Sequence, residues 1–228
     1  MKICLAMMVR DEMGIIPRTL PIYLESFEHR VALDTGSADG TAAWLSDHGF
    51  RVILGDWNSN FSSSRNQLLD EVKSYGFDWC VMLDADETMF PADVISLVNA
   101  LPSATSPVIY LPRYNIAGNY DRWWNKTDPD YQGRVIKLGS GIRFTNPVHE
   151  VPTMNGDGRP AIIQGHGCIS DQPIYHYGLC KNAESIWRRT LNYRALARGE
   201  REPNESGETP PANFSHLPMF DLPHPLHA

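Results

Sequence analysis

The sequence predicts an α/β fold, a helix–sheet–helix sandwich with a mainly parallel central sheet and a short C-terminal β/helix extension. Strand-like and helix-like segments alternate over the first hundred residues, and such alternation implies parallel strands joined by right-handed crossovers. The strand-like segments are almost continuously apolar, which is typical of a sheet covered on both faces. We therefore expect ligands to bind beyond the carboxyl ends of the strands.

Four strands and four helices make up the alternating part. The expected strands are 2–9, 30–34, 50–54 and 77–83. The expected helices are 14–29, 39–49, 62–76 and 91–101. Gly49 ends the second helix, a serine caps the third, and Pro91 lies in the first turn of the fourth. Pro21 is expected to kink or restart the first helix.

The pattern changes after residue 105. Further strands are expected at 106–116, 133–139 and 141–152, followed by a helix over 181–200. From residue 202 the chain is rich in Pro, Asn, Glu and His and has little periodicity, so a loosely ordered tail is expected there.

Composition limits the function classes. The 228 residues are 42% hydrophobic and 21% charged, as in a globular protein with a substantial core. The formal net charge of −7 argues against a nucleic-acid-binding surface. No apolar run approaches the roughly 20 residues of a membrane span, and the N-terminus resembles a first strand more than a signal peptide.

The cysteines indicate a reducing compartment. None of the four forms a CxxC pair, and Cys4 and Cys80 lie inside apolar, strand-like runs. We therefore expect reduced thiols and a cytoplasmic protein. The spacing of Cys168 and Cys180, with the histidines near them, fits no common zinc template.

The segment DWCVMLDADE, residues 78–87, ends an apolar strand in three carboxylates within four positions, those of Asp84, Asp86 and Glu87. Carboxylates packed together without a cation repel one another and take up protons or turn to water. This segment is either an ordinary solvated turn or the place where a cation binds.

The segment LDTGSADGT, residues 33–41, is a second signal. Asp34 ends a strand, and the turn after it leads into a helix. Asp, Gly and Ser are common in ordinary turns. An ordinary turn does not explain why this one follows a strand some fifty residues before an Asp-x-Asp at the end of another.

Five motifs together carry a resemblance to a known family. VRDE, DTGSADGT, FSSSRNQLLD, DWCVMLDADE and NPVHE occur in the order seen in family 2 glycosyltransferases with the GT-A fold. The chain is most similar to small bacterial and phage-type enzymes resembling lipopolysaccharide-core glucosyltransferases, over roughly residues 1 to 195. The resemblance implies one domain in two halves, a nucleotide-sugar-binding half at 1–105 and an acceptor-side half at 106–200, before the tail at 201–228.

The resemblance implies donor-binding roles for five side chains. Asp34 would accept a hydrogen bond from the base, and a fixed acceptor is selective because a buried unpaired partner costs about 1–3 kcal/mol. Arg10 and Glu12 would contact the nucleotide, and Arg65 and Arg134 would lie near the diphosphate. The alternatives are a turn carboxylate for Asp34 and solvated surface charges for Arg10, Glu12 and Arg65.

It also implies a divalent cation, which would explain the three clustered carboxylates. Asp86 would bind the metal directly, and Asp84 would face the ribose and the metal shell. All-oxygen ligation by carboxylates and phosphates favours Mn²⁺ or Mg²⁺ over zinc. His176 is expected either to complete the metal shell or to be a satisfied core histidine beside two tyrosines.

The implied reaction is the inverting transfer of a hexose from a nucleoside-diphosphate sugar, first of all a UDP-sugar, to an acceptor hydroxyl of a carbohydrate or lipid-linked glycan. One base must take the hydroxyl proton, and we assign it to Glu150, with His149 placing the sugar or sharing that role. Trp123 and Trp124 are expected either to stack on sugars or to pack a loop onto the core. The alternatives are a sugar-nucleotide-binding protein with only residual hydrolase activity and a nucleotidyltransferase, although the chain lacks the glycine-rich phosphate loop of the latter.

Overall fold

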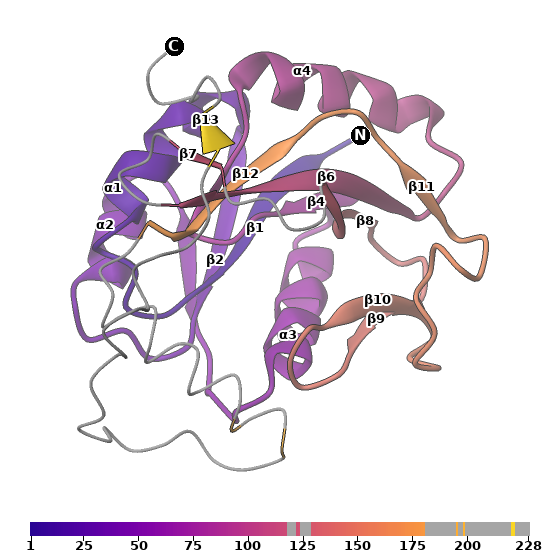
Figure 1. The fold of residues 1–228 in the computed structure, drawn as a ribbon. Coiled ribbons are helices and arrows are strands. Elements are labelled where there is room, and N and C mark those ends of the chain that lie inside the picture. The colour runs from indigo at the N-terminus through magenta and orange to yellow at the C-terminus, as the bar shows by residue number, and fades with distance from the viewer. Residues whose placement is uncertain (118–121, 124–128, 181–194, 196–197, 199–219, 222–228) are drawn as a thin grey trace.

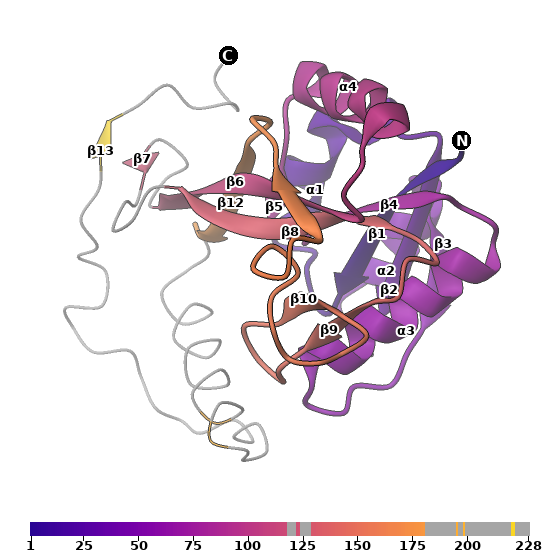
Figure 2. The same cartoon turned by 90° about the vertical axis from the view of Figure 1, so that its right-hand side faces the viewer.

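The computed structural model describes residues 1–117, 122–123, 129–180, 195, 198 and 220–221. Its centre is a parallel sheet formed by the first four strands, in the order β3-β2-β1-β4 (Figures 1 and 2). These strands are β1 (Ile3–Val9), β2 (His29–Asp34), β3 (Arg51–Leu54) and β4 (Trp79–Met82). Because they are parallel, their carboxyl ends lie at the same edge of the sheet.

The sheet continues beyond β4 with mixed pairing. Strand β8 (Asp130–Lys137) pairs antiparallel with β4, and β6 (Val108–Ala117) pairs antiparallel with β8. Strand β12 (Ile174–Leu179) runs parallel to β6 and antiparallel to the short β5 (Glu87–Thr88). The remaining members of this sheet are β7 (Arg122–Trp123), β11 (Gly167–Ile169) and β13 (Phe220–Asp221). A separate antiparallel hairpin consists of β9 (Ile142–Thr145) and β10 (Val151–Met154).

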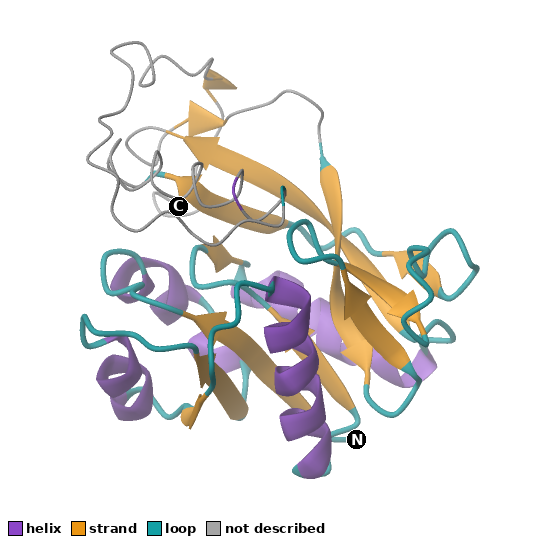
Figure 3. Ribbon diagram, turned by 90° about the horizontal axis from the view of Figure 1, so that it is seen from below, coloured by secondary structure: helices purple, strands orange, loops and turns teal. Residues whose placement is uncertain are grey.

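Helices cover both faces of the parallel part, as predicted. One apolar core joins the sheet to α1 (Ile16–Thr19), α2 (Thr41–Asp47) and α4 (Pro91–Ala100), with the 3₁₀ turns η1 (Leu20–Ile22), η2 (Leu24–Ser26) and η3 (Leu101–Ser103). A second core joins the other face to α3 (Phe61–Ser74) and the β9–β10 hairpin. Figures 1 and 2 show α4 and α3 on opposite sides of the sheet. The helices gather around one half of the sheet, and the other strands extend beyond them (Figure 3).

Three predicted elements differ from the structure. The helix expected over 14–29 is divided into α1, η1 and η2, since Pro21 has no N–H to continue an α-helix. Helix α3 starts at Phe61, and its cap is Asn60, whose side chain accepts from the Ser63 N–H at 3.1 Å, rather than a serine. The strand expected over 141–152 is the β9–β10 hairpin.

The hairpin has a local cause. Asn146 and His149 have positive φ angles of 74° and 55°, and two residues in the left-handed region reverse the chain rather than extend it. Strands β11 and β12 were not predicted. The helix expected over 181–200 and the tail from 202 lie almost wholly outside the described residues. Within the described part, no helix is both long and apolar enough to cross a membrane.

Candidate functional site

The turn after β4 carries the predicted Asp-x-Asp pair and is held from several sides. The Asp84 N–H donates to Oε2 of Glu87 at 3.0 Å, and the Glu87 N–H donates to the Asp84 carbonyl at 2.9 Å. The Ala85 carbonyl accepts from Oγ1 of Thr19 at 2.7 Å. The Asp86 carbonyl accepts from the backbone N–H of residue 177 at 2.7 Å. The three acidic side chains therefore project from a fixed backbone.

A buried chain of ion pairs runs through this turn. Nε of Arg65 donates to Oε1 of Glu150 at 2.6 Å, and its Nη2 donates to Oδ1 of Asp84 at 2.9 Å. Nη2 of Arg134 lies 2.6 Å from Oδ2 of Asp84 and 2.5 Å from Oε1 of Glu87. The side chains of Arg65 and Arg134 are only 4% and 5% exposed. The structure thus brings together four predicted site residues from α3, β8, the β4 turn and the hairpin.

Two further residues, Arg113 and Asp130, extend this chain of ion pairs, and no sequence pattern indicated their pairing. Arg113 donates through Nε and Nη2 to Asp130, at 3.2 and 2.6 Å, and its Nη1 lies 3.5 Å from Oε1 of Glu87. Arg113 and Asp130 face each other across β6 and β8. Their pairing follows from strand register, which the sequence alone does not contain. The contacts of Glu87, whose side chain is fully buried, also depend on how the strands pair.

The arginines determine the ionisation of Asp84. Burial opposes its negative charge, but Arg134 and then Arg65 outweigh burial and hold the pKa of Asp84 well below its usual range. Burial also raises the pKa of Tyr23, reinforced by Glu87, Asp84 and Asp86. Tyr23 is therefore a neutral phenol, and its OH donates to the Glu87 carbonyl at 3.3 Å.

His176 lies beside Asp86. Its Nε2 is 3.5 Å from Oδ1 of Asp86, and its Nδ1 is 2.7 Å from Oδ1 of Asn115. Because an amide oxygen only accepts, we assign a proton to Nδ1, while Nε2 faces the carboxylate of Asp86. The pairing of β12 with β5 places His176 there. Within the part of the chain that the structure describes, no three His, Cys, Asp or Glu side chains form a complete metal site.

Asp34 has one satisfied and one unsatisfied oxygen. Its Oδ1 accepts from the N–H groups of Gly36 and Ser37, at 2.9 and 2.7 Å. Its Oδ2 is buried and has no hydrogen-bond partner, and the residue as a whole is only 1% exposed. A buried acceptor without a donor is costly, so this atom is suited to a donor group on a ligand.

The loop after β1 is fastened to the loop after β2. The Asp11 N–H donates to Oγ of Ser37, and the Glu12 N–H donates to Oγ1 of Thr41. The Met13 N–H donates to Oδ2 of Asp39, and the Ala38 N–H donates to Oδ1 of Asp11. Arg10 is exposed where β1 ends, and Glu12 is half-buried. Both therefore lie at the same sheet edge as Asp34.

The turn at 146–150 is fastened to α3. The Phe61 N–H donates to the Pro147 carbonyl at 2.9 Å. The side chain of Asn66 exchanges two hydrogen bonds with the backbone of Phe144, at 2.8 and 2.9 Å. Glu150 is held by Arg65, whereas His149 is exposed and has a strained backbone.

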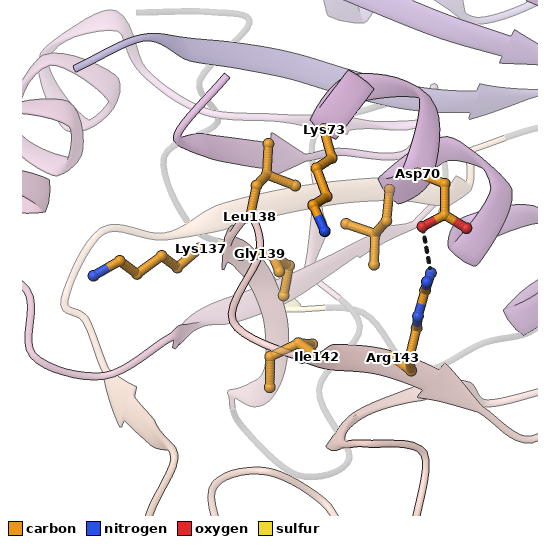
Figure 4. A pocket seen from close by; sticks show the side chains of 10 residues that line it. Asp70, Lys73, Lys137, Leu138, Gly139, Ile142 and Arg143 are labelled. Carbon is orange, nitrogen blue, oxygen red and sulfur yellow. Dashed lines mark ion pairs between the residues drawn. The ribbon is translucent and has the colours of Figure 1, made fainter. Parts of the chain in front are cut away.

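A pocket of about 60 Å³ lies away from these residues, between the second half of α3, the end of β8 and the start of β9 (Figure 4). Leu69, Ile136 and Ile142 line it, with Lys73 at its rim, and Arg143 forms an ion pair with Asp70 beside it. None of the predicted site residues lines it.

Comparisons with known proteins agree with this architecture. The family described as "Glycosyl transferase family 2" matches residues 25–162. A TPR repeat-containing protein of Synechococcus elongatus is 36% identical over 154 residues, which are 66% of this chain and 35% of that protein. The chain thus spans about a third of the length of this curated relative.

Two solved structures share the fold. The S. aureus protein TarS (residues 1–349) in complex with UDP-GlcNAc has 11% identity and a TM-score of 0.54, over 82% of this chain and 61% of that one. Glucosyl-3-phosphoglycerate synthase of Mycobacterium tuberculosis, in complex with Mn²⁺, UDP and glucosyl-3-phosphoglycerate, has 12% identity and a TM-score of 0.56, over 86% of this chain and 77% of that one. These likenesses confirm the predicted GT-A class of α/β fold.

Proposed function

Because this chain belongs to glycosyl transferase family 2, we propose that it is an inverting transferase that moves a hexose from a UDP-sugar to an acceptor hydroxyl. One observation carries the proposal furthest. The unpartnered Oδ2 of Asp34 lies at the sheet edge that also holds the Asp84–Glu87 turn. A nucleoside base at Asp34 would therefore bind at the same edge as the cluster of charges.

We assign the binding of the sugar-nucleotide donor to residues along this edge. The imide N–H of uracil would donate to Oδ2 of Asp34, with Arg10 and Glu12 on the nucleotide side. Arg65 and Arg134 supply the positive charge nearest the Asp-x-Asp turn, and we assign them to the diphosphate. Two proteins of the same fold were solved with UDP-GlcNAc and with UDP, which supports uridine as the first nucleoside to test.

A divalent cation, Mn²⁺ or Mg²⁺, fits the residues present only if the donor completes its coordination. Asp86 and His176 would hold it, since Nε2 of His176 is directed toward Asp86. Both oxygens of Asp84 already accept from arginines, so we assign Asp84 to the ribose and the outer part of the metal shell. When bound, the cation supplies Lewis-acid stabilisation of the charge that develops on the departing diphosphate.

Glu150 is the proposed general base, with His149 beside it for sugar placement. Glu150 is 14% exposed and is oriented by the Nε of Arg65. In-line displacement requires a base on the face of the sugar opposite the leaving diphosphate, and oriented general-base help contributes about 10²–10⁴-fold. The acceptor, a carbohydrate or lipid-linked glycan, would be bound by the half of the domain from 106 to 200, and the donor by residues 1–105.

Titration calorimetry with UDP and Mn²⁺, followed by an assay of UDP release with a panel of UDP-sugars and glycan acceptors, tests the proposal. We expect UDP to bind and UDP release to rise when an acceptor is added. Binding with only slow, acceptor-independent release would indicate a sugar-nucleotide-binding protein. Release of pyrophosphate from UTP and a sugar 1-phosphate, with no release of UDP from UDP-sugars, would indicate a nucleotidyltransferase.

A further inference from the structure

The buried carboxylate of Glu87 accepts from three groups that belong to three different elements. They are the Asp84 N–H in the β4 turn at 3.0 Å, Nη2 of Arg134 on β8 at 2.5 Å, and Nη1 of Arg113 on β6 at 3.5 Å. Its side chain is 0% exposed. A buried charge without partners is costly, and the two short contacts, from the Asp84 N–H and from Arg134, hold Glu87 in place, whereas Arg113 adds a longer contact.

Glu87 also constrains the position of the Arg134 guanidinium. Nη2 of Arg134 is shared between Glu87 and Asp84, while its Nε is buried without a hydrogen-bond partner. Glu87 thus fixes the position of this arginine through one nitrogen. The same nitrogen contacts Asp84. A displacement of Arg134 would therefore also take its positive charge away from the Asp-x-Asp turn.

We propose that Glu87 is a positioning residue, which holds the Asp84 turn and directs Arg134 toward the diphosphate of the donor without itself touching the substrate. This inference rests on the proposed function, because it assumes that Arg134 and the turn bind a nucleoside diphosphate. It differs from a purely structural role in one respect. Loss of the Glu87 charge weakens donor binding even where the protein remains folded.

Asp130 provides a matched control. It is a carboxylate of the same ion-pair chain and pairs with Arg113 through two hydrogen bonds, but no contact joins it to Arg134 or to Asp84 among the interactions of the described residues. Its side chain is 34% exposed, so water compensates for part of any change there. Asp130→Asn therefore removes one carboxylate while leaving the Glu87–Arg134–Asp84 contacts in place.

The experiment compares Glu87→Gln with Asp130→Asn in three measurements: the UDP dissociation constant with Mn²⁺, KM and kcat for the donor, and hydrogen exchange of the peptide spanning 84–88. Substitution of residues that orient metal ligands costs about 10–100-fold in metal affinity or activity, and we expect the same range for a residue that orients Arg134. For Glu87→Gln we expect UDP binding to weaken by this factor, the donor KM to rise and hydrogen exchange at 84–88 to become faster. For Asp130→Asn we expect all three quantities to change by less than about threefold. Unchanged UDP binding and exchange in a folded Glu87→Gln protein would overturn the proposal.

A charge-balanced variant covers the case in which Glu87→Gln does not fold. Glu87→Gln combined with Arg113→Gln removes one charge of each sign and leaves the partly exposed Asp130 to water. We expect it to fold and still to bind UDP weakly, whereas UDP binding equal to that of Arg113→Gln alone would overturn the proposal. If the unaltered protein binds no nucleotide, the proposed function fails. The exchange measurement then still decides whether Glu87 holds the turn.

Discussion

Arg65 joins Glu150 to the Asp-x-Asp turn, with Nε 2.6 Å from Oε1 of Glu150 and Nη2 2.9 Å from Oδ1 of Asp84. One guanidinium on α3 thereby connects two motifs separated by more than sixty positions in the chain. Burial opposes the charge of Arg65, but Asp84 and then Glu150 outweigh it and raise its pKa further. The arginine therefore stays charged, and the distance between the proposed base and the donor-side turn is set by one side chain.

Glu150→Gln is expected to lower kcat by about 10²–10⁴-fold while UDP affinity stays near that of the unaltered protein. The amide keeps the shape of the side chain and an oxygen for Arg65, but it does not take up a proton. Calorimetry with UDP and turnover measurements with saturating donor check the two parts. Glu25→Gln, at an exposed position, is the control, and an equal loss of UDP affinity and turnover in Glu150→Gln would place this residue on the donor side.

Asp34→Asn is expected to weaken UDP binding by about 1–3 kcal/mol, which is about 5–150-fold. The amide oxygen still accepts from Gly36 and Ser37, but the NH₂ group replaces the free acceptor Oδ2 with a donor. The stability of the fold should change little, as measured by urea unfolding. UDP affinity equal to that of the exposed control Asp47→Asn would show that the base does not bind at Asp34.

Asp86→Ala is expected to abolish the dependence of UDP binding on Mn²⁺. Loss of one of the two protein ligands removes most of the site, since the described residues near it provide only Asp86 and His176. The electron paramagnetic resonance signal of free Mn²⁺, titrated with protein in the presence of UDP, gives a measurement independent of turnover. Full activity of the unaltered protein after treatment with a chelator would contradict the metal assignment.

Asp39→Asn is expected to lower stability at pH 7 and to reduce its decline in acid. Partial burial opposes ionisation of Asp39, but hydrogen bonds from Thr41 and Met13 outweigh it and lower its pKa. A carboxyl whose pKa is lower in the folded state stabilises the protein above its unfolded pKa, about 3.9. This stabilisation is lost as the pH falls through the folded pKa.

Urea unfolding midpoints at pH 7 and pH 3 check this prediction. The unaltered protein should lose more stability between the two values than Asp39→Asn does. An equal loss in both proteins would mean that the fastening of the two loops does not depend on the charge of Asp39. Asp47→Asn serves again as the control.

The parallel half of the fold and the residues at its edge could be predicted from the sequence because short-range patterns determine them. Apolar strands and helix ends locate β1 to β4. Asp34 is the last residue of β2, and Asp84 lies two positions after the end of β4. The break of the first helix at Pro21 was also anticipated. The neighbours of Asp84 could be named only in part, since Arg65 and Arg134 were placed near the diphosphate but not in contact with Asp84.

The remainder depends on register and on backbone angles that the sequence does not contain. The Arg113–Asp130 pair requires the alignment of β6 with β8. The position of His176 beside Asp86 requires β12 to pair with β5. The hairpin requires positive φ angles at Asn146 and His149, and neither residue type is bound to adopt them.

The pairing of β12 with β5 also determines the order in which a growing chain can assemble the site. The hydrogen bonds of Asp34 that the structure describes come from Gly36, Ser37 and Gly55, whose N–H donates to the Asp34 carbonyl. The contact between Asp86 and His176 can form only after His176, ninety positions later in the chain, has been synthesised. Contacts of long sequence separation form late because loop closure costs entropy first. A ribosome-bound chain can therefore form the turn around Asp34 before His176, the proposed cation ligand, has been synthesised.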